Sequence, residues 1–141
     1  MANGMAKRTV QTHYPENPPD WYWVKGLHDA HITLAEAFEF PFDYNRFTRE
    51  KNSYDRSCLT LTVDASGAMF DTSVKVIRLY NYKYLSPDAM LEGHGTLWWI
   101  GDRLTVSDGR FELEIDLYDG EGFPKEFTVR VRFDRAEVER Q

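Results

Sequence analysis

Two segments near the C-terminal end of the chain alternate strictly between apolar and polar residues. The apolar positions are Phe111, Leu113, Ile115 and Leu117 in the first segment and Phe127, Val129, Val131 and Phe133 in the second. A repeat of two puts every second side chain on the same face, so each segment predicts a β-strand with one buried and one solvated face. The glycine-containing loop at residues 119–124 joins the two strands, which predicts an antiparallel hairpin.

The polar faces of these strands predict how they pair. Setting Phe111 opposite Phe133 brings the glutamates of the first strand against the arginines of the second. The expected pairs are then Phe111–Phe133, Glu112–Arg132, Leu113–Val131 and Glu114–Arg130. A slip of one residue would set glutamate opposite valine and bury charge, so we expect this register.

Weaker alternation elsewhere predicts further short strands. They are expected at residues 21–24, 28–40, 59–63, 74–85, 97–100 and 104–106. Within 74–85 the apolar residues change from one face of the predicted strand to the other. This indicates either a bulge near Val76–Ile77 or burial on both faces. In 28–40, Ile32, Leu34, Phe38 and Phe40 would lie on one face of a strand, which favours a strand. Good helix formers in the same segment make a helix over 30–38 the alternative.

Turn-forming residues separate these strands. Asp64–Gly67 and Ser107–Gly109 have the composition of tight turns, and Gly101–Asp102 is expected to turn the chain between two strands. Residues 42–57 form a long polar connection. Residues 86–91 begin with Ser-Pro, a common helix start, which predicts one helical turn.

This arrangement of elements predicts the fold class. About seven short strands with turns between them, and at most one or two short helices, are typical of an antiparallel β-sandwich or a flattened barrel. Pro15, Pro18 and Pro19 disfavour a helix near the start of the chain. We therefore expect residues 1–20 to be a flexible proline-rich arm ahead of a single β domain at 21–141.

Composition narrows the classes of function. The chain has 141 residues, of which 17 are basic and 23 acidic, giving a net charge of −6. Nucleic acids and anionic membranes are negatively charged and bind proteins that carry positive surface charge. Neither is therefore expected as a partner of this acidic chain. Residues 1–10 lack the apolar core of a secretory signal, and Cys58 is the single cysteine, which fits a reducing cytoplasm.

Three residues have the side chains of metal ligands. His28 and His31 flank Asp29 closely in sequence, but on a strand the two histidines would point to opposite faces. On a helix they would share a face, and a third ligand would have to come from elsewhere, with His94 as the candidate. We therefore expect no metal and no cofactor, with Asp29 in a turn and His28 at a strand start.

No group of residues predicts catalysis. Cys58 has neither a glycine-rich elbow nor a following helix start that would activate a thiol. An enzyme would need His28, His94, Asp29 or Asp102 to converge in one pocket, and nothing in their spacing indicates that they do. We expect no catalytic residue.

Aromatic residues are the better candidates for a binding surface. Tyr80, Tyr82 and Tyr84 would share one face of a strand, whereas Trp98 and Trp99, as neighbours, must face opposite sides. Both tryptophans are buried only if their strand is covered on both sides. Otherwise one ring is exposed, and exposed Trp and Tyr are frequent in protein interfaces. Burial in the core is the alternative for all five rings.

These features predict a non-catalytic domain that meets a protein partner, or a second copy of itself, through an aromatic sheet face. The alternative is a β-sandwich that stacks a carbohydrate or an apolar ligand against Tyr82, Tyr84 or Trp98. An enzyme is the least favoured of the three classes.

Two short motifs resemble a group of small bacterial β-rich proteins. The run Leu27-His28-Asp29-Ala30-His31-Ile32 is followed by the strand Leu59-Thr60-Leu61-Thr62-Val63-Asp64. Some proteins of that group are immunity proteins that neutralise polymorphic toxins. The resemblance covers residues 27–64 of the 141. It implies a bacterial, cytoplasmic, non-enzymatic protein and transfers no functional residue.

Overall fold

The described residues of the protein fold as one antiparallel sheet of nine strands, whose edge strands are not paired with each other. The computed structural model of the chain describes residues 8–16, 25–39, 57–86, 89–122 and 125–141, and these residues contain no α-helix. The elements are β1 (Thr9–His13), the 3-10 turn η1 (Lys25–Leu27), β2 (His31–Glu39), β3 (Ser57–Asp64), β4 (Val74–Tyr80), β5 (Lys83–Tyr84), β6 (Leu97–Ser107), β7 (Arg110–Tyr118), β8 (Glu126–Phe133) and β9 (Arg135–Arg140).

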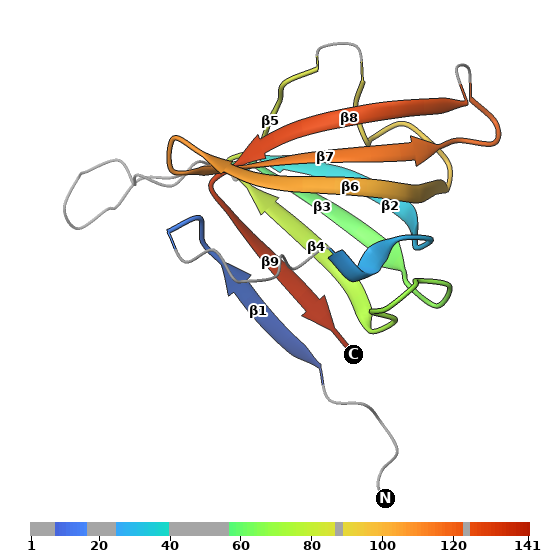
Figure 1. Cartoon of the computed structure of the whole chain (residues 1–141), viewed down its shortest axis with the longest axis horizontal. Coiled ribbons are helices and arrows are strands. Elements are labelled where there is room, and N and C mark those ends of the chain that lie inside the picture. Colours follow the sequence, from blue (N-terminus) through green and yellow to red (C-terminus); the bar gives the residue numbers. More distant parts are fainter. Residues whose placement is uncertain (1–7, 17–24, 40–56, 87–88, 123–124) are drawn as a thin grey trace, which may run out of the picture.

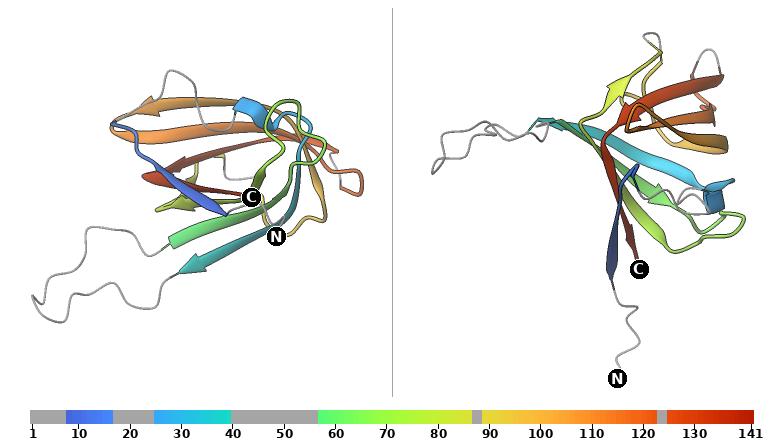
Figure 2. Two further views of the ribbon diagram at one scale, coloured as in Figure 1. Left: turned by 90° about the horizontal axis from the view of Figure 1, so that it is seen from below. Right: turned by 60° about the vertical axis from the view of Figure 1, so that its left-hand side comes forward.

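The sheet has two halves that meet at a narrow junction. The strand order is β1-β9-β4-β3-β2-β6-β7-β8-β5. Strands β2 and β6 join the halves through only two residue pairs, His31 with Trp98 and Ile32 with Leu97. The strands of the two halves run in different directions (Figure 1). Figure 2 shows β6 and β7 on one side of the molecule and β2 and β3 on the other.

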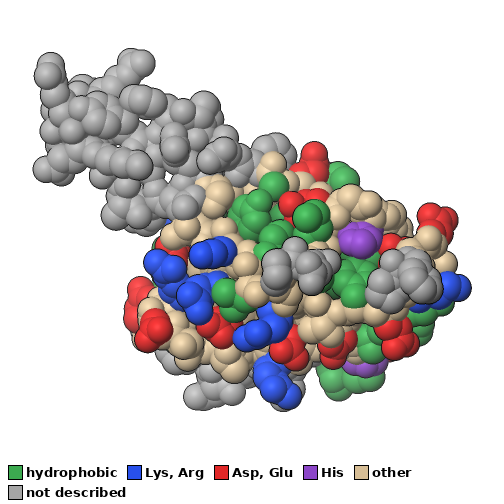
Figure 3. Space-filling view, turned by 90° about the horizontal axis from the view of Figure 1, so that it is seen from above, with side chains coloured by type: hydrophobic (Ala, Val, Ile, Leu, Met, Phe, Trp, Pro, Cys, Tyr) green, Lys and Arg blue, Asp and Glu red, His purple; other side chains and the backbone are tan. Residues whose placement is uncertain are grey.

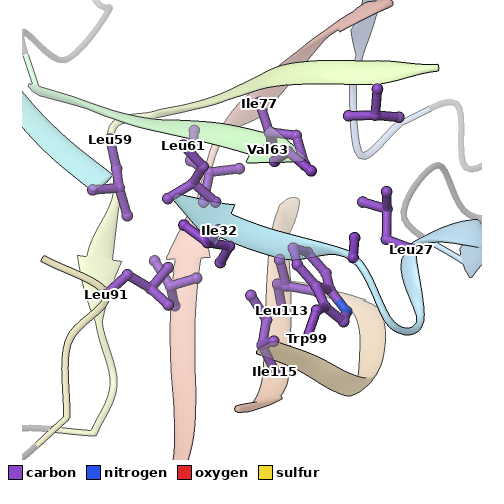
Figure 4. Close-up of a cluster of buried hydrophobic side chains, with 14 of the residues drawn as sticks. Leu27, Ile32, Leu59, Leu61, Val63, Ile77, Leu91, Trp99, Leu113 and Ile115 are labelled. Atoms are coloured by element: carbon purple, nitrogen blue, oxygen red, sulfur yellow. The ribbon is translucent and has the colours of Figure 1, made fainter. Parts of the chain in front are cut away.

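The hydrophobic core lies between the two halves. Leu59, Leu61 and Ile77 reach it from one half, and Leu113 and Ile115 reach it from the other (Figure 4). All five side chains are buried. Burying such a side chain contributes roughly 1.5–3 kcal/mol, so this inner face supplies most of the favourable energy of folding.

The terminal hairpin has the predicted register. All four predicted pairs of β7 and β8 are opposite each other. Glu112 Oε1 accepts a hydrogen bond from Arg132 at 2.8 Å, and the ion pair between Glu114 and Arg130 is longer, at 3.7 Å. The preceding β6–β7 turn has positive φ at Asp108 and Gly109, 53° and 72°, which is the backbone that an Asp-Gly hairpin turn favours.

The mainly β, antiparallel class is confirmed, but the predicted strand count and architecture need correction. The described residues form nine strands rather than about seven, in a single sheet that is not a closed barrel. Gly101–Asp102 does not form a turn, because β6 runs through both residues and pairs with β7 on either side of a bulge between Trp99 and Gly101. Residues 135–140 follow β8 directly. They form β9, which pairs with β4 in the other half.

The strand predicted for 28–40 is confirmed over β2, but Ile32 and Leu34 do not lie on the same face as predicted. A bulge between Ile32 and Leu34 adds one residue to β2 relative to β3. Ile32 is therefore buried, Leu34 is exposed and Ala35 packs against the core. The bulge predicted in β4 is present in the pairing with β9, between Val74 and Val76, slightly earlier than expected.

The structure describes other predicted segments only in part. Within the expected arm, Thr9–His13 forms an edge strand on β9. The strand expected at 21–24 and the connection at 42–56 lie outside the described residues. Residues 87 and 88 of the expected helical turn also lie outside them, and Ala89–Leu91 is not helical. The turn at Asp64–Gly67 is confirmed, with the Asp64 carboxylate accepting from the Ser66 amide at 3.0 Å.

Candidate functional site

The two neighbouring tryptophans lie on opposite faces of β6, as the alternation predicted. Trp99 is 0% exposed in the core, and its Nε1 donates to Oδ2 of Asp102 at 2.8 Å. Trp98 is 42% exposed on the outer face. Of the two candidates, only Trp98 is accessible to a partner.

Trp98 stands at the centre of a row of side chains that crosses the junction between the halves. The row occupies facing register positions on β3, β2, β6, β7 and β8 and consists of Asp64, His31, Trp98, Tyr118 and Glu126. The His31 ring lies nearly parallel to the indole at 6.4 Å between centroids. The Tyr118 ring stands at 80° to the indole at 6.1 Å. We call these five residues the Trp98 row.

Asp29 fixes the orientation of the indole. Its Oδ1 accepts a hydrogen bond from Nε1 of Trp98 at 3.0 Å, and its Oδ2 lies 3.1 Å from Nδ1 of His28. Asp29 has φ of 73°, a left-handed conformation that aspartate tolerates better than most residues. Its amide donates to the carbonyl of Trp99 at 2.8 Å. The turn that precedes β2 is thereby attached to β6.

The loop at 65–71 packs against this turn and carries two exposed apolar side chains. The Met69 amide donates to the His28 carbonyl at 2.8 Å, and the Phe70 amide donates to the Gly26 carbonyl at 3.2 Å. Met69 is 54% exposed and Phe70 is 70% exposed. A Cβ at Gly26 would lie 2.7 Å from that of Asp71, so only glycine allows this close approach.

Met69 and Phe70 were not among the residues predicted from the sequence. The sequence signal that could have identified them is that both are large and apolar, follow a turn and fit no alternating strand. Figure 1 shows η1, the loop after β3 and the starts of β6 and β8 at the same end of the molecule. This end presents the protein's candidate binding surface.

An open depression of about 310 Å³ adjoins the row. Its lining consists of Ile100, Asp116, Leu117, Glu126, Phe127 and Thr128. The Thr128 hydroxyl donates to Oδ1 of Asp116 at 2.6 Å, which leaves the other oxygen of that carboxylate for a ligand. Because Glu126 belongs to both the row and the depression, the two form one continuous surface.

The three candidate tyrosines do not share a face, which corrects the prediction. The chain turns at Asn81, with φ of 56°, so that Tyr80 ends β4 and Tyr84 lies in β5 at the far edge of the sheet. Tyr82 and Tyr84 pack against the core. A single strand through residues 80–84 was the assumption behind the predicted stripe.

Tyr80 and Tyr84 are each held by a carboxylate. The Tyr80 hydroxyl donates to Glu137 at 2.5 Å, and Arg135 lies 4.0 Å over its ring. The Tyr84 hydroxyl donates to Glu92 and accepts from the Leu91 amide at 3.0 Å. Burial and these bonds to glutamate raise the pKa of both phenols. These contacts stabilise the fold and occupy both phenol hydroxyl groups.

His94 and Asp119 form the pair closest in appearance to a catalytic dyad. Nδ1 of His94 lies 2.8 Å from Oδ2 of Asp119, and its Nε2 lies 3.0 Å from the Met90 carbonyl. Both ring nitrogens are therefore in contact with acceptor groups of the protein itself. The bonds from His94 and from the Glu121 amide lower the pKa of Asp119. The pair fastens the β7–β8 turn to the segment that precedes β6.

The residues that an enzyme would need are not brought together. His28 lies against Asp29, His94 lies against Asp119, and Asp102 bonds Trp99. Cys58 is buried, and burial raises the pKa of its thiol. Within the described ranges, no group of three or more His, Cys, Asp or Glu side chains is placed to hold a metal ion.

Comparison with protein-family models, curated proteins and solved structures found no match for the chain. Within the described part of the chain, no helix has the length and apolar character needed to cross a membrane.

Proposed function

We propose that this protein is a non-catalytic domain that binds a protein partner through the end of the sheet around Trp98. The surface consists of Asp29, His31, Met69, Phe70, Trp98 and Tyr118, and we call it the Trp98 surface. The observation that carries the proposal is that three large apolar side chains are exposed around one turn: Met69, Phe70 and Trp98. Aromatic residues and methionine are enriched where proteins meet.

The polar residues of this surface support the same proposal. Asp29 and His31 border the indole directly, so that apolar contacts are surrounded by groups able to form hydrogen bonds. Protein interfaces have this composition, with an apolar centre and a polar rim. The indole is also held in place before any partner arrives, and such preorganisation reduces the entropy lost on binding.

An immunity-type role is a specific form of this proposal. The net charge of −6 suits capture of a basic protein, and the motifs at residues 27–64 resemble those of some immunity proteins. Such a role would place the protein in the bacterial cytoplasm. The ligand-binding alternative receives less support, because Tyr82, Tyr84 and Trp98 line neither the 310 Å³ depression nor a second one of about 180 Å³.

The test begins with affinity purification of tagged protein from extract of the source cells. Each captured protein is then purified and its Kd is measured by calorimetry. Met69→Ser/Phe70→Ser is the test variant, and Val10→Ser/Val106→Ser, which removes two exposed apolar side chains elsewhere, is the matched control. We expect the test variant to bind at least about 30-fold more weakly and the control to bind like the wild type.

A second copy of the chain is the other possible partner, and sedimentation velocity detects it. In that case the wild type and the control variant sediment as dimers and the test variant sediments as a monomer. The proposal is overturned if the wild type is monomeric and every directly binding partner binds the test variant as tightly as the wild type.

A further inference from the structure

Carboxylates surround the exposed rings of the Trp98 surface. Asp29 bonds the indole itself, Asp64 is paired with His31, and Glu126 is paired with Tyr118. Asp116 lines the adjoining depression. Two hydrogen bonds from Ser66 lower the pKa of Asp64, so this carboxyl is charged at neutral pH.

Basic side chains on the outer face of the same strands lie toward the opposite end. The register of β5 to β8 sets them near the β6–β7 turn, and they are Lys83, Arg103, Arg110, Arg130 and Arg132. Figure 3 shows Lys and Arg side chains gathered at one end of this face. Near the Trp98 surface, Lys75 interacts with Asp64 and Arg140 donates to Asp71. Lys125 lies in the β7–β8 turn and Lys25 lies in η1. In the described part of the chain, no ion pair joins Asp29, Asp116 or Glu126 to a lysine or an arginine.

We propose that the Trp98 surface recognises a basic segment of its protein partner, with an arginine or lysine side chain placed on the exposed part of the Trp98 indole. This inference rests on the proposed function and names the chemistry of the partner. A cation is attracted to the face of an indole, and here Tyr118 supplies a second ring at 80° to the first.

Charge decides between a cationic and an anionic partner. An acidic segment over Trp98 would meet Asp29 at the indole and then Asp64 and Glu126 at the two ends of the row. A basic segment meets attraction at each of these positions. The depression beside Glu126 has room for a second side chain of the segment, with the Asp116 carboxylate to receive it.

The test uses a capped hexaarginine peptide as the probe and capped hexacitrulline as its neutral analogue of the same shape. The protein is labelled with ¹⁵N, and the indole N–H signal of Trp98 is followed at low salt. We expect hexaarginine to shift this signal in a saturable way and hexacitrulline to leave it in place. Added salt should weaken the binding of hexaarginine.

Variants separate local recognition from attraction by the net charge. Asp116→Asn/Glu126→Gln removes two charges beside the row, while the amide oxygen introduced at position 116 can still accept from Thr128. Glu36→Gln/Asp108→Asn removes two exposed charges elsewhere and is the matched control. We expect the first variant to bind hexaarginine about fivefold or more weakly and the control to bind like the wild type. Trp98→Leu, which lacks the indole signal and is measured by calorimetry beside the wild type, should also lose about fivefold or more.

The proposal is overturned if hexaarginine moves the indole signal no more than hexacitrulline does. It is also overturned if the control variant loses as much affinity as Asp116→Asn/Glu126→Gln, because the attraction would then be general. Either result leaves the proposed function standing if Met69→Ser/Phe70→Ser still loses its partner. If that variant binds its partner normally, the proposed function fails whatever the peptide does.

Discussion

Nε1 of Trp98 donates a hydrogen bond to Oδ1 of Asp29, 3.0 Å away, although the two residues are 69 positions apart in the chain. This bond lies where β2 and β6 join the two halves of the sheet. One carboxylate thereby sets the exposed Trp98 ring relative to a turn and a strand junction.

Substitutions of Asp29 test whether its backbone is left-handed. Asp29→Ala and Asp29→Gly both lose the bond to Trp98, but only alanine also strains the backbone at φ of 73°. We expect Asp29→Ala to be about 1 kcal/mol less stable than Asp29→Gly in urea unfolding. Asp29→Asn keeps an acceptor for Trp98 and should lie closest to the wild type. Equal stability of the alanine and glycine variants would contradict the turn geometry.

The two tryptophans should differ sharply in their contribution to stability. Trp99→Ala empties a fully buried site and removes the bond to Asp102, so we expect a loss of about 3–5 kcal/mol. Trp98→Ala removes a ring that is 42% exposed and should cost about 1 kcal/mol. Urea unfolding monitored by circular dichroism measures both. A larger loss for Trp98→Ala would mean that this ring belongs to the core.

The ion pairs of the β7–β8 hairpin should differ in strength. Glu112 and Arg132 are 2.8 Å apart, whereas Glu114 and Arg130 are 3.7 Å apart. Double-mutant cycles with glutamine should give a coupling of about 0.5–1 kcal/mol for the first pair and about 0.3 kcal/mol or less for the second. If the second pair couples more strongly, the register places these side chains differently from the structure.

Asp119 should make the stability of the fold sensitive to acid. Its pKa lies below the usual 3.8, because His94 and the Glu121 amide hydrogen-bond to the carboxylate. The unfolded chain therefore binds this proton more tightly than the folded one. The stabilisation is complete above pH 3.8 and is lost as the pH falls through the folded pKa.

Urea unfolding of the wild type and of Asp119→Asn between about pH 5 and pH 2 measures this effect. We expect the advantage of the wild type over the variant to shrink as the pH falls. A constant difference over this range would show that Asp119 does not titrate differently in the two states.

The hairpin could be predicted from sequence because everything that determines it is local. The alternation in residues 111–117 and 127–133 fixes two faces, and the opposite charges leave one favourable register. Which side chains of β2 lie on the buried face could not be predicted in this way. One extra residue between Ile32 and Leu34 exposes Leu34 and turns Ala35 toward the core, and a bulge has no strong sequence signature.

Of the surface that we propose for binding, only Trp98 was named as a binding candidate from the sequence. Alternation requires Trp98 and Trp99 to face opposite sides but does not say which side is covered. That depends on pairing across the sheet, which buries Trp99 between the halves. Met69 and Phe70 are attached to the turn before β2 through backbone bonds to His28 and Gly26, contacts between distant segments that no local pattern shows.

Hydroxyl-radical footprinting of the protein with and without its purified partner tests the central proposal most directly. Met69, Phe70 and Trp98 are exposed and oxidise readily, and Tyr14 is an exposed control at the end of β1. We expect the partner to slow oxidation of the first three residues several-fold and to leave Tyr14 unchanged. Protection of Tyr14 with continued oxidation of Trp98, Met69 and Phe70 would place the interface elsewhere and contradict the account.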